Sequence, residues 1–209
     1  MDTTFTIFVV DDDASVLRAL SRLLRARGYD VRAHASSVEF LASHDPTVPG
    51  CVVLDVSMPG LDGLELQRAL TAAASQRPII FLTGKGSIPM SVQAMRAGAI
   101  DFLTKPVNDK DLLTAIARAE EQDRKSRQAY AELMSIHAKI ASLTPRERQV
   151  LTHVVAGRLN KQIAGDLGTV EKTIKVHRGR MMEKLGVRTV ADLVRLAEKA
   201  GISRQGWTS

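Results

Sequence analysis

The sequence predicts an α/β domain with a five-stranded, doubly wound parallel sheet, joined by a helical linker to a small all-α domain with helix-turn-helix spacing. The first 120 residues alternate short apolar runs with amphipathic segments, the pattern of such a sheet. From Asp109 the pattern stays helical, with no Gly or Pro before Pro145. Near the end, NKQIAGDLGTVEKTIKVH places two short helices around a glycine turn. We therefore expect domains at residues 1–120 and 142–209, with a linker at 121–141.

Five short apolar runs are the expected strands of the sheet. They are Thr6–Val10, Asp30–Ala33, Cys51–Asp55, Ile79–Leu82 and Ile100–Leu103. Amphipathic stretches lie between them, the clearest being Ala14–Arg27, Leu61–Ala74 and Ile88–Ala97. Gly28 and Gly98 follow two of these stretches, and glycine is a frequent residue after a helix end. Five strands with five helices would fill a domain of this length.

The last domain opens with a strong helix-start signal in LTPRERQVL. Thr144 can cap the helix, Pro145 occupies the favoured first position, and Glu147 completes a capping box. Gly157 ends this helix, NKQIAGDLG forms a short second helix, and Val170–Leu185 and Val190–Lys199 form a third and a fourth. This domain is therefore expected to be all-helical.

The linker allows two interpretations. Residues 120–128 are nearly all polar, which fits either the exposed middle of a long helix or a flexible joint. Apolar residues then return at helical spacing at Tyr130, Leu133, Ile136 and Ile140. They are expected to pack either on the next domain or on a second subunit.

Composition restricts the class of protein. The chain has 209 residues, is 44% hydrophobic and reads as globular. Its one cysteine, Cys51, excludes an intrachain disulfide and a thiol-based metal site, which favours a reducing location such as the cytoplasm. The start, MDTTFTIFVVDDD, has neither the basic region of a signal peptide nor the length of a membrane span, and no later segment spans a membrane.

Charge differs sharply between the two halves. Residues 1–120 carry 12 Lys/Arg against 14 Asp/Glu, whereas residues 121–209 carry 17 against 9. An acidic first part and a basic second part indicate two tasks, the second involving a polyanion such as nucleic acid. The alternative for the second part is a solvated basic face without a partner.

Polar side chains stand at the carboxyl ends of the expected strands. They are Asp11, Asp12 and Asp13 after the first, Asp55 after the third, Thr83 after the fourth and Lys105 after the fifth. In an open parallel sheet these ends share one ligand crevice. Clustered carboxylates repel one another by about 4 kcal/mol per pair at 4 Å and an effective dielectric constant near 20, so a cation is expected among them. Oxygen ligands in an open site suit Mg²⁺, and Lys105 and Thr83 suit phosphoryl oxygens, so the crevice is expected to pass a phosphoryl group to Asp55.

These residues resemble the receiver domains of bacterial two-component response regulators, over Phe5 to Ala119. The acidic pair matches Asp11 and Asp12, the phosphoacceptor Asp55 in VVLDVSMPGLDGLEL, the switch hydroxyl Thr83 in IIFLTGKGS and the lysine Lys105 in DFLTKP. The resemblance implies a flavodoxin-like fold, a metal ligand in the Ser57 carbonyl, a switch aromatic in Phe102 and a cis Lys105–Pro106 peptide. In this family the positions of Ser57 and Lys85 influence the lifetime of the acyl phosphate, whereas Asp13 is expected only to start a helix.

Two other phosphate chemistries fail on spacing. A P-loop needs a glycine where Ile79 stands and a Ser or Thr where Gly86 stands. An aspartate-nucleophile phosphatase needs a second aspartate two residues after the first, and this place holds Ser57.

The basic segment has the features of a DNA-reading helix. Ile163, Ala164, Leu167 and Ile174 are expected to face inward, with Gly168 in the turn. The outward face of the second helix then carries Lys172, Thr173, Lys175, Val176, Arg178 and Arg180. The alternative is a generic basic amphipathic helix.

Residues 143–202 resemble the LuxR-type module of NarL- and FixJ-like regulators, through the landmarks LTPRERQVL, NKQIA, TIKVH and EKLGV. The resemblance implies that Lys175 and Val176 meet base edges, while Thr173, His177, Lys161 and Arg178 mostly touch the DNA backbone. Thr169, Val170 and Gly179 depart from the usual pattern, which puts the start of the reading helix and one base contact in question.

Together the resemblances imply a response regulator transcription factor. A sensor histidine kinase is expected to phosphorylate Asp55 with Mg²⁺, which favours a homodimer that binds promoter DNA; RNA polymerase is a further expected partner. The fourth helix, with Thr189 at its start, is the expected subunit contact. The chain is expected to catalyse only its own phosphoryl transfer and slow dephosphorylation. The alternatives are a constitutive DNA-binding regulator, a metal-dependent phosphohydrolase and a receiver that acts only through proteins.

Overall fold

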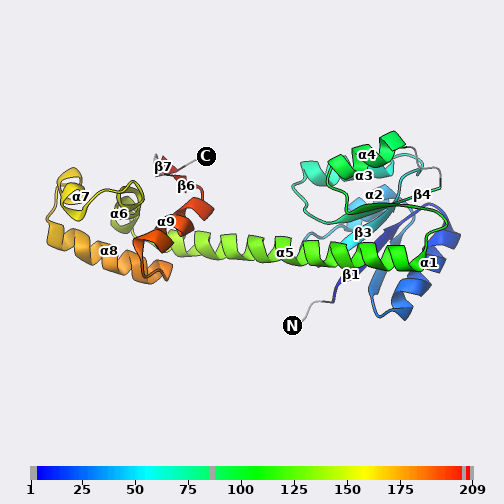
Figure 1. Cartoon of the computed structure of the whole chain (residues 1–209), viewed down its shortest axis with the longest axis horizontal. Helices are drawn as coiled ribbons and strands as arrows, with labels where there is room; N and C mark the ends of the chain where they lie inside the picture. Colours follow the sequence, from blue (N-terminus) through cyan, green and yellow to red (C-terminus); the bar gives the residue numbers. More distant parts are fainter. Residues whose placement is uncertain (1–3, 85–87, 204–205, 208–209) are drawn as a thin grey trace. The chain divides into compact units, whose positions relative to one another are not determined.

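The computed structural model describes residues 4–84, 88–203 and 206–207, and its first part is a parallel sheet. In that described part the strands are β1 (Thr6–Val10), β2 (Asp30–His34), β3 (Gly50–Asp55), β4 (Ile79–Thr83) and β5 (Asp101–Thr104). All neighbours pair in parallel, in the order β2-β1-β3-β4-β5 (Figure 1). This confirms the predicted doubly wound sheet.

The sheet buries both of its faces. Every residue of β1, β3 and β4 is buried, as expected for central strands covered by helices on both sides. Alternate residues feed two cores, one containing Ile7 and Val53, the other Phe8 and Leu54. The three central strands are therefore packed on both faces up to their carboxyl ends.

Helices connect the strands. They are α1 (Ala14–Ala26), α2 (Ser37–Ser43), α3 (Gly63–Ala72) and α4 (Ile88–Arg96). Asp13 caps α1 by accepting from the Ser15 N–H at 2.7 Å, which confirms that it starts this helix. The short α2 had no predicted range, because its seven residues give too little periodicity to identify it.

Several strand limits differ from the predicted ones by one residue. β3 begins at Gly50, where a Cβ would lie 2.0 Å from the Thr6 carbonyl oxygen, so the strand start requires glycine. β4 includes Thr83, and β5 runs one residue later than predicted, from Asp101. These shifts keep the order of the polar residues at the strand ends.

A single helix, α5 (Asp109–Ala141), covers the predicted linker. The chain divides into two compact units after Arg127, a point that lies inside this helix. Leu112 and Ile116 belong to a core of the first unit, and Ile136 and Ile140 to the core of the second. The later apolar residues of the linker therefore pack on the following domain, while Tyr130 stays 65% exposed.

The second unit is built from short helices, α6 (Pro145–Val155), α7 (Asn160–Asp166), α8 (Glu171–Leu185) and α9 (Val190–Lys199). The capping box of Thr144 and Glu147 is present, as predicted. The predicted helical domain is confirmed. The sequence did not predict the two-residue strands β6 (Ile202–Ser203) and β7 (Gly206–Trp207), which pair antiparallel at its end. Two-residue strands leave too little pattern to predict. Within the described ranges, no helix has the length and apolar character that crossing a membrane requires.

Candidate functional site

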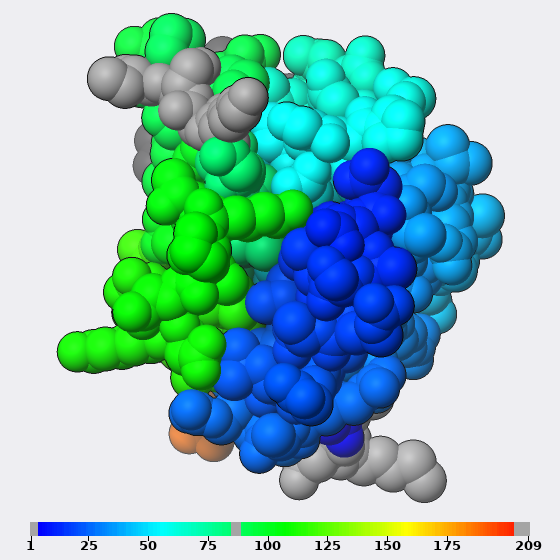
Figure 2. Space-filling view, turned by 90° about the vertical axis from the view of Figure 1, so that its right-hand side faces the viewer, coloured from blue at the N-terminus to red at the C-terminus, as the bar shows by residue number. Residues whose placement is uncertain are grey.

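Three of the predicted site residues meet at the carboxyl edge of the sheet. Asp11 directly follows β1, Asp55 is the last residue of β3, and Lys105 directly follows β5. Because the strands are parallel, these ends lie at one edge, and Figure 2 shows segments from the blue, cyan and green parts of the chain meeting on one face. The strand ends therefore bring these three side chains together at one edge of the sheet.

The Lys105 ammonium joins the two carboxylates. Its Nζ lies 2.6 Å from Asp11 Oδ2 and 2.6 Å from Asp55 Oδ1. The Asp11 and Asp55 side chains are 1% and 5% exposed, so solvent screens this contact weakly. One cation thus offsets the repulsion between two buried anions.

Burial and charge act in opposite directions on these groups. Burial raises the pKa of Asp11, and its bonds to Lys105 and to the Asp13 N–H compensate only in part. Burial by itself would lower the pKa of Lys105, but the hydrogen bonds and negative charges of Asp11 and Asp55 outweigh it and raise that pKa. Lys105 therefore remains charged while it holds the pair.

Backbone groups fix the other oxygen of each carboxylate. The Ser57 N–H donates to Asp55 Oδ2 at 2.8 Å, and the Asp13 N–H donates to Asp11 Oδ1 at 3.0 Å. Gly63, at the start of α3, lies so close to this turn that a Cβ would be 2.4 Å from the Asp55 carbonyl oxygen. The turn after β3 therefore closes tightly beneath Asp55, and sequence reasoning did not identify this role of Gly63.

Asp12 stands apart from the buried pair. Its side chain is exposed, and no cluster of three or more His, Cys, Asp or Glu residues placed to hold a metal occurs in the part of the chain that the structure describes. Ser57 is also exposed. The structure thus brings together Asp11, Asp55 and Lys105 and leaves Asp12 and Ser57 at the rim.

The residues expected to respond to phosphorylation lie on β4 and β5, the strands that follow β3 in the sheet. Thr83 is fully buried at the end of β4, the strand next to β3. Phe102 is half-buried, with its ring centroid 6.0 Å from that of Phe81. The Lys105–Pro106 peptide is cis, as the resemblance implied. Lys85 lies outside the described residues.

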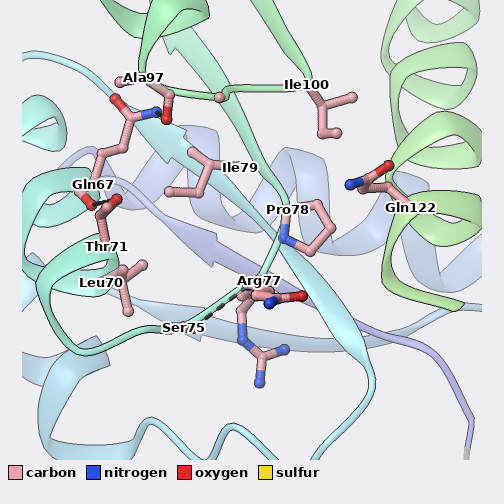
Figure 3. Close-up of a pocket in the computed structure, with 12 residues that line it drawn as sticks. Gln67, Leu70, Thr71, Ser75, Arg77, Pro78, Ile79, Ala97, Ile100 and Gln122 are labelled. Carbon is pink, nitrogen blue, oxygen red and sulfur yellow. Dashed lines mark hydrogen bonds between the residues drawn. The ribbon is translucent and has the colours of Figure 1, made fainter. Parts of the chain in front are cut away.

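A second polar pocket lies at the opposite edge of the sheet. It is lined by Gln67, Leu70, Thr71, Ser75, Gln76, Arg77, Pro78, Ile79, Ala97, Gly98, Ile100 and Gln122 (Figure 3). The Gln67 side-chain amide donates to the Ala94 and Ala97 carbonyls at 3.2 Å each. This donor in the pocket wall therefore already has hydrogen-bond acceptors. Pro78 precedes β4 whereas Thr83 ends it, so this pocket is separate from the carboxylate pair.

The helix-turn-helix presents the predicted basic face. Ile163, Ala164 and Ile174 are buried between α7 and α8. Lys161, Lys172, Lys175 and Arg180 are exposed, and Val176 is 46% exposed. Ile174 therefore faces inward, and Lys172, Lys175, Val176 and Arg180 face outward, as the spacing predicted.

Two contacts on this face were not predicted from the sequence. Arg178 Nη1 donates to Asn160 Oδ1 at 2.9 Å, and Lys175 Nζ lies 3.4 Å from Glu171 Oε1. Thr173, His177 and Arg178 are half-buried rather than fully exposed. The Glu171–Lys175 spacing is an ordinary helical signal, whereas nothing local relates Asn160 to Arg178.

The start of α8 reflects the unusual residue at position 170. The helix begins at Glu171, and Val170, which is 65% exposed, has no side-chain oxygen with which to cap it. The predicted start at Val170 is therefore one residue early.

Two family models match this chain. The response regulator receiver domain matches residues 7–117, and the luxR family of bacterial regulatory proteins matches residues 141–197. Nodulation protein W of Bradyrhizobium diazoefficiens is 46% identical over 201 residues, which cover 96% of this chain and 88% of that protein. Transcriptional regulatory protein FixJ of the same organism is 41% identical and covers 97% of this chain and 98% of its own length.

Solved structures agree with the sequence matches. The structure of the response regulator StyR is 47% identical, covers 94% of this chain and 99% of its own, and superimposes with a TM-score of 0.83. The chain therefore belongs to the two-component response regulators of the NarL/FixJ type, with a receiver domain and a LuxR-type DNA-binding domain.

Family membership defines the general role. The protein is a transcription regulator rather than an ordinary enzyme. Its receiver domain implies a histidine kinase as partner, and its LuxR-type domain implies binding to DNA. Receiver domains generally bind Mg²⁺ at the acidic pocket that Asp11 and Asp55 form here.

Proposed function

We propose that a sensor histidine kinase phosphorylates Asp55 in a Mg²⁺-dependent reaction, and that this modification controls dimerisation and sequence-specific DNA binding. The observation that carries the proposal is the buried pair of carboxylates, Asp11 and Asp55, on one ammonium at 2.6 Å each. Two buried anions held around one cation suit a phosphoryl-transfer site, because the cation can also stabilise the negative oxygens of a phosphoryl group. Burying such a charged cluster is costly, which supports a functional role for it rather than a purely structural one.

The donor set fits a magnesium ion. Carboxylate oxygens of Asp11, Asp12 and Asp55, with the carbonyl oxygen of Ser57, would hold it, and the exposure of Asp12 and Ser57 leaves room for coordinating water. The approach of Lys105 to both buried carboxylates supports this fit, because it shows that a cation is accommodated at that point. When bound, Mg²⁺ supplies positive charge that stabilises the phosphoryl oxygens during transfer.

The chain's own residues then position and stabilise the phosphoryl group. An Asp55 oxygen bonds to phosphorus as the bond between phosphorus and the kinase histidine breaks. Lys105 exchanges its Asp55 contact for a phosphoryl oxygen, and the Thr83 hydroxyl donates to another. Phe102, at the edge of its core, follows Thr83 inward. Water later cleaves the acyl phosphate slowly, which restores the carboxylate.

The output follows from the second unit. Lys175 and Val176 are exposed on α8, where they can reach base edges, while Lys161, Lys172, Thr173, His177, Arg178 and Arg180 serve the backbone. Two copies would read half-sites about one helical turn apart, with α9 as the contact between subunits. RNA polymerase is a further partner, and the cytoplasm is the proposed location.

The test compares Asp55→Asn with a matched control, Asp13→Asn. Acetyl phosphate and Mg²⁺ should add one phosphoryl group to the wild type and increase its dimer fraction, measured by intact mass and light scattering. Asp55→Asn should show neither change. Asp13→Asn should behave as the wild type, because asparagine also caps a helix and the hydrogen bonds of the exposed Asp13 side chain go to Ser15.

An unchanged mass and oligomeric state of the wild type would contradict the proposal. It would favour a constitutive DNA-binding regulator whose receiver does not respond. If the wild type showed no salt-dependent affinity for any duplex, this would instead favour a receiver that acts only through proteins. Steady turnover of a phosphoester would favour a phosphohydrolase.

A further inference from the structure

Arg178 differs from the other basic residues of the reading helix. Lys172, Lys175 and Arg180 are exposed, whereas Arg178 is half-buried and its Nη1 donates to Asn160 Oδ1 at 2.9 Å. Asn160 is the first residue of α7, so the bond joins the two helices of the helix-turn-helix across 18 positions of sequence. The guanidinium is therefore held by a neighbouring helix.

The chemistry of this bond leaves the cation available. A guanidinium has five N–H groups and an asparagine oxygen occupies one of them, so the others can donate to a phosphate. Asparagine is also neutral, so it holds Arg178 without cancelling its charge. Lys175 gives the contrast, because its partner at 3.4 Å is the carboxylate of Glu171.

Holding the side chain in advance favours binding. A free arginine loses rotamer freedom when it docks on a phosphate, and that loss weakens the complex. An arginine that is already restrained by Asn160 loses less. The benefit requires that the restrained guanidinium reach the DNA-facing side of α8. Arg178 lies on the same side of this helix as the exposed Lys175, three residues earlier.

We propose that Asn160 is a positioning residue for DNA binding, which holds the Arg178 guanidinium ready to donate to a backbone phosphate at the flank of the major groove. This inference rests on the proposed DNA-binding function of α8. Asn160 itself acts through Arg178 and does not need to touch the DNA. The competing explanation is that the bond only ties α7 to α8.

A double-mutant cycle in the full-length chain tests the proposal. The proteins are the wild type, Asn160→Ala, Arg178→Ala and the double variant, and the probe is a duplex selected from a random library by the wild type. Asn160→Ala should weaken binding by about 2- to 10-fold, with the salt dependence retained because the charge remains. Arg178→Ala should weaken binding and reduce the salt slope by about 0.9. The double variant should bind no more weakly than Arg178→Ala alone.

Lys161→Ala is the matched control, because Lys161 is the exposed neighbour of Asn160 and its loss should add to that of Arg178→Ala. Asn160→Asp separates positioning from a structural tie. The aspartate keeps an acceptor between the helices, but its negative charge offsets the positive charge of Arg178. The melting temperature of this variant should therefore equal or exceed that of the wild type, while its binding to DNA stays weak.

Three results would overturn the inference. They are wild-type affinity in Asn160→Ala, an equal loss from Asn160→Ala in the presence and absence of Arg178, and full rescue of binding by Asn160→Asp. A wild type without salt-dependent affinity for any duplex would remove the proposed DNA-binding function, and the inference with it. The first three results leave that function intact, so the two failures are distinguishable.

Discussion

Two histidines, the buried His34 and the half-buried His44, flank the ring of Phe40 in the receiver domain. The ring centroids of His34 and His44 lie 5.5 and 5.2 Å from that of Phe40. Burial lowers the pKa of His34, with Glu39 opposing and Arg32 adding to the effect. Burial also lowers the pKa of His44, with Arg77 adding to it and Asp45 opposing. At the residue scale, the folded receiver therefore holds both rings neutral.

This arrangement predicts a receiver that loses stability in weak acid. A histidine whose pKa is lowered in the folded state stabilises fully above its unfolded pKa of about 6.5, and that contribution is lost as pH falls through the folded value. The free energy of unfolding should decrease below about pH 6.5, by at most about 1.4 kcal/mol per pH unit for each ring. Urea unfolding of the wild type between about pH 5 and 8 measures this slope.

The double variant His34→Gln/His44→Gln should flatten the slope, whatever its absolute stability. His137→Gln is the control, because His137 is exposed on α5. A slope that the double variant leaves unchanged would show that other groups cause the acid sensitivity.

At the element scale, the start of α6 combines a local signal with a distant partner. The Glu147 carboxylate, 2% exposed at the residue level, accepts from the Thr144 N–H at 2.9 Å and from Lys184 Nζ at 2.6 Å. The first contact is the predicted capping box, whereas the second comes from α8. The hydrogen bond from Lys184 lowers the pKa of Glu147, so the pair remains charged near neutral pH.

Glu147→Gln should destabilise the second unit more than an equal change on the surface. Glutamine keeps an acceptor for the Thr144 N–H but removes the negative partner of Lys184. The expected cost is about 1–3 kcal/mol, below the full range for buried pairs because the Lys184 side chain is 37% exposed. Glu171→Gln, which breaks the exposed pair with Lys175, should cost less than about 0.5 kcal/mol. Urea unfolding compares the stabilities of the two variants. Equal losses in the free energy of unfolding would show that the Glu147–Lys184 pair has no special role.

At the scale of the whole molecule, α5 contributes to both compact units. The Arg127 guanidinium on this helix donates to three backbone carbonyls, those of Pro46 at 3.0 Å, Thr47 at 2.9 Å and Val48 at 2.7 Å. The Asp123 carboxylate, buried on the same helix, accepts from Arg127 Nε at 2.8 Å. These contacts hold the helix to the receiver beyond the expected limit at residue 120. The first part of the expected linker is therefore a structural part of the receiver.

Loss of the Arg127 contacts should destabilise one turn or more of α5. Arg127→Met removes charge-assisted hydrogen bonds worth about 1.5–3 kcal/mol, so amide hydrogen exchange at residues 120–127 should accelerate by about 10-fold or more. Arg124→Met is the matched control on the same helix, because Arg124 is exposed and pairs with Glu121 three residues away. Equal exchange in both variants would show that helix propensity alone maintains this segment.

The fold was largely predictable because its strongest signals are local. Runs such as Thr6–Val10 and Cys51–Asp55 are apolar except at one end, and central parallel strands require such runs. The meeting of Asp11, Asp55 and Lys105 was predictable for a related reason. Parallel strands carry their end residues to one edge, so the positions of these residues along the chain indicate that they meet. The short α2 and the β6–β7 pair were missed because few residues carry each pattern.

The sequence by itself determined the order of elements, the helix caps and the residue types at the strand ends, since all of these depend on neighbours within a few positions. Only the tertiary structure decided which charges pair. It placed Lys105 between two carboxylates while leaving Asp12 exposed, held Arg178 on Asn160, and bound Arg127 to a distant loop. The reason is physical: such contacts join segments that are far apart in the chain, and their geometry exists only after the cores have packed.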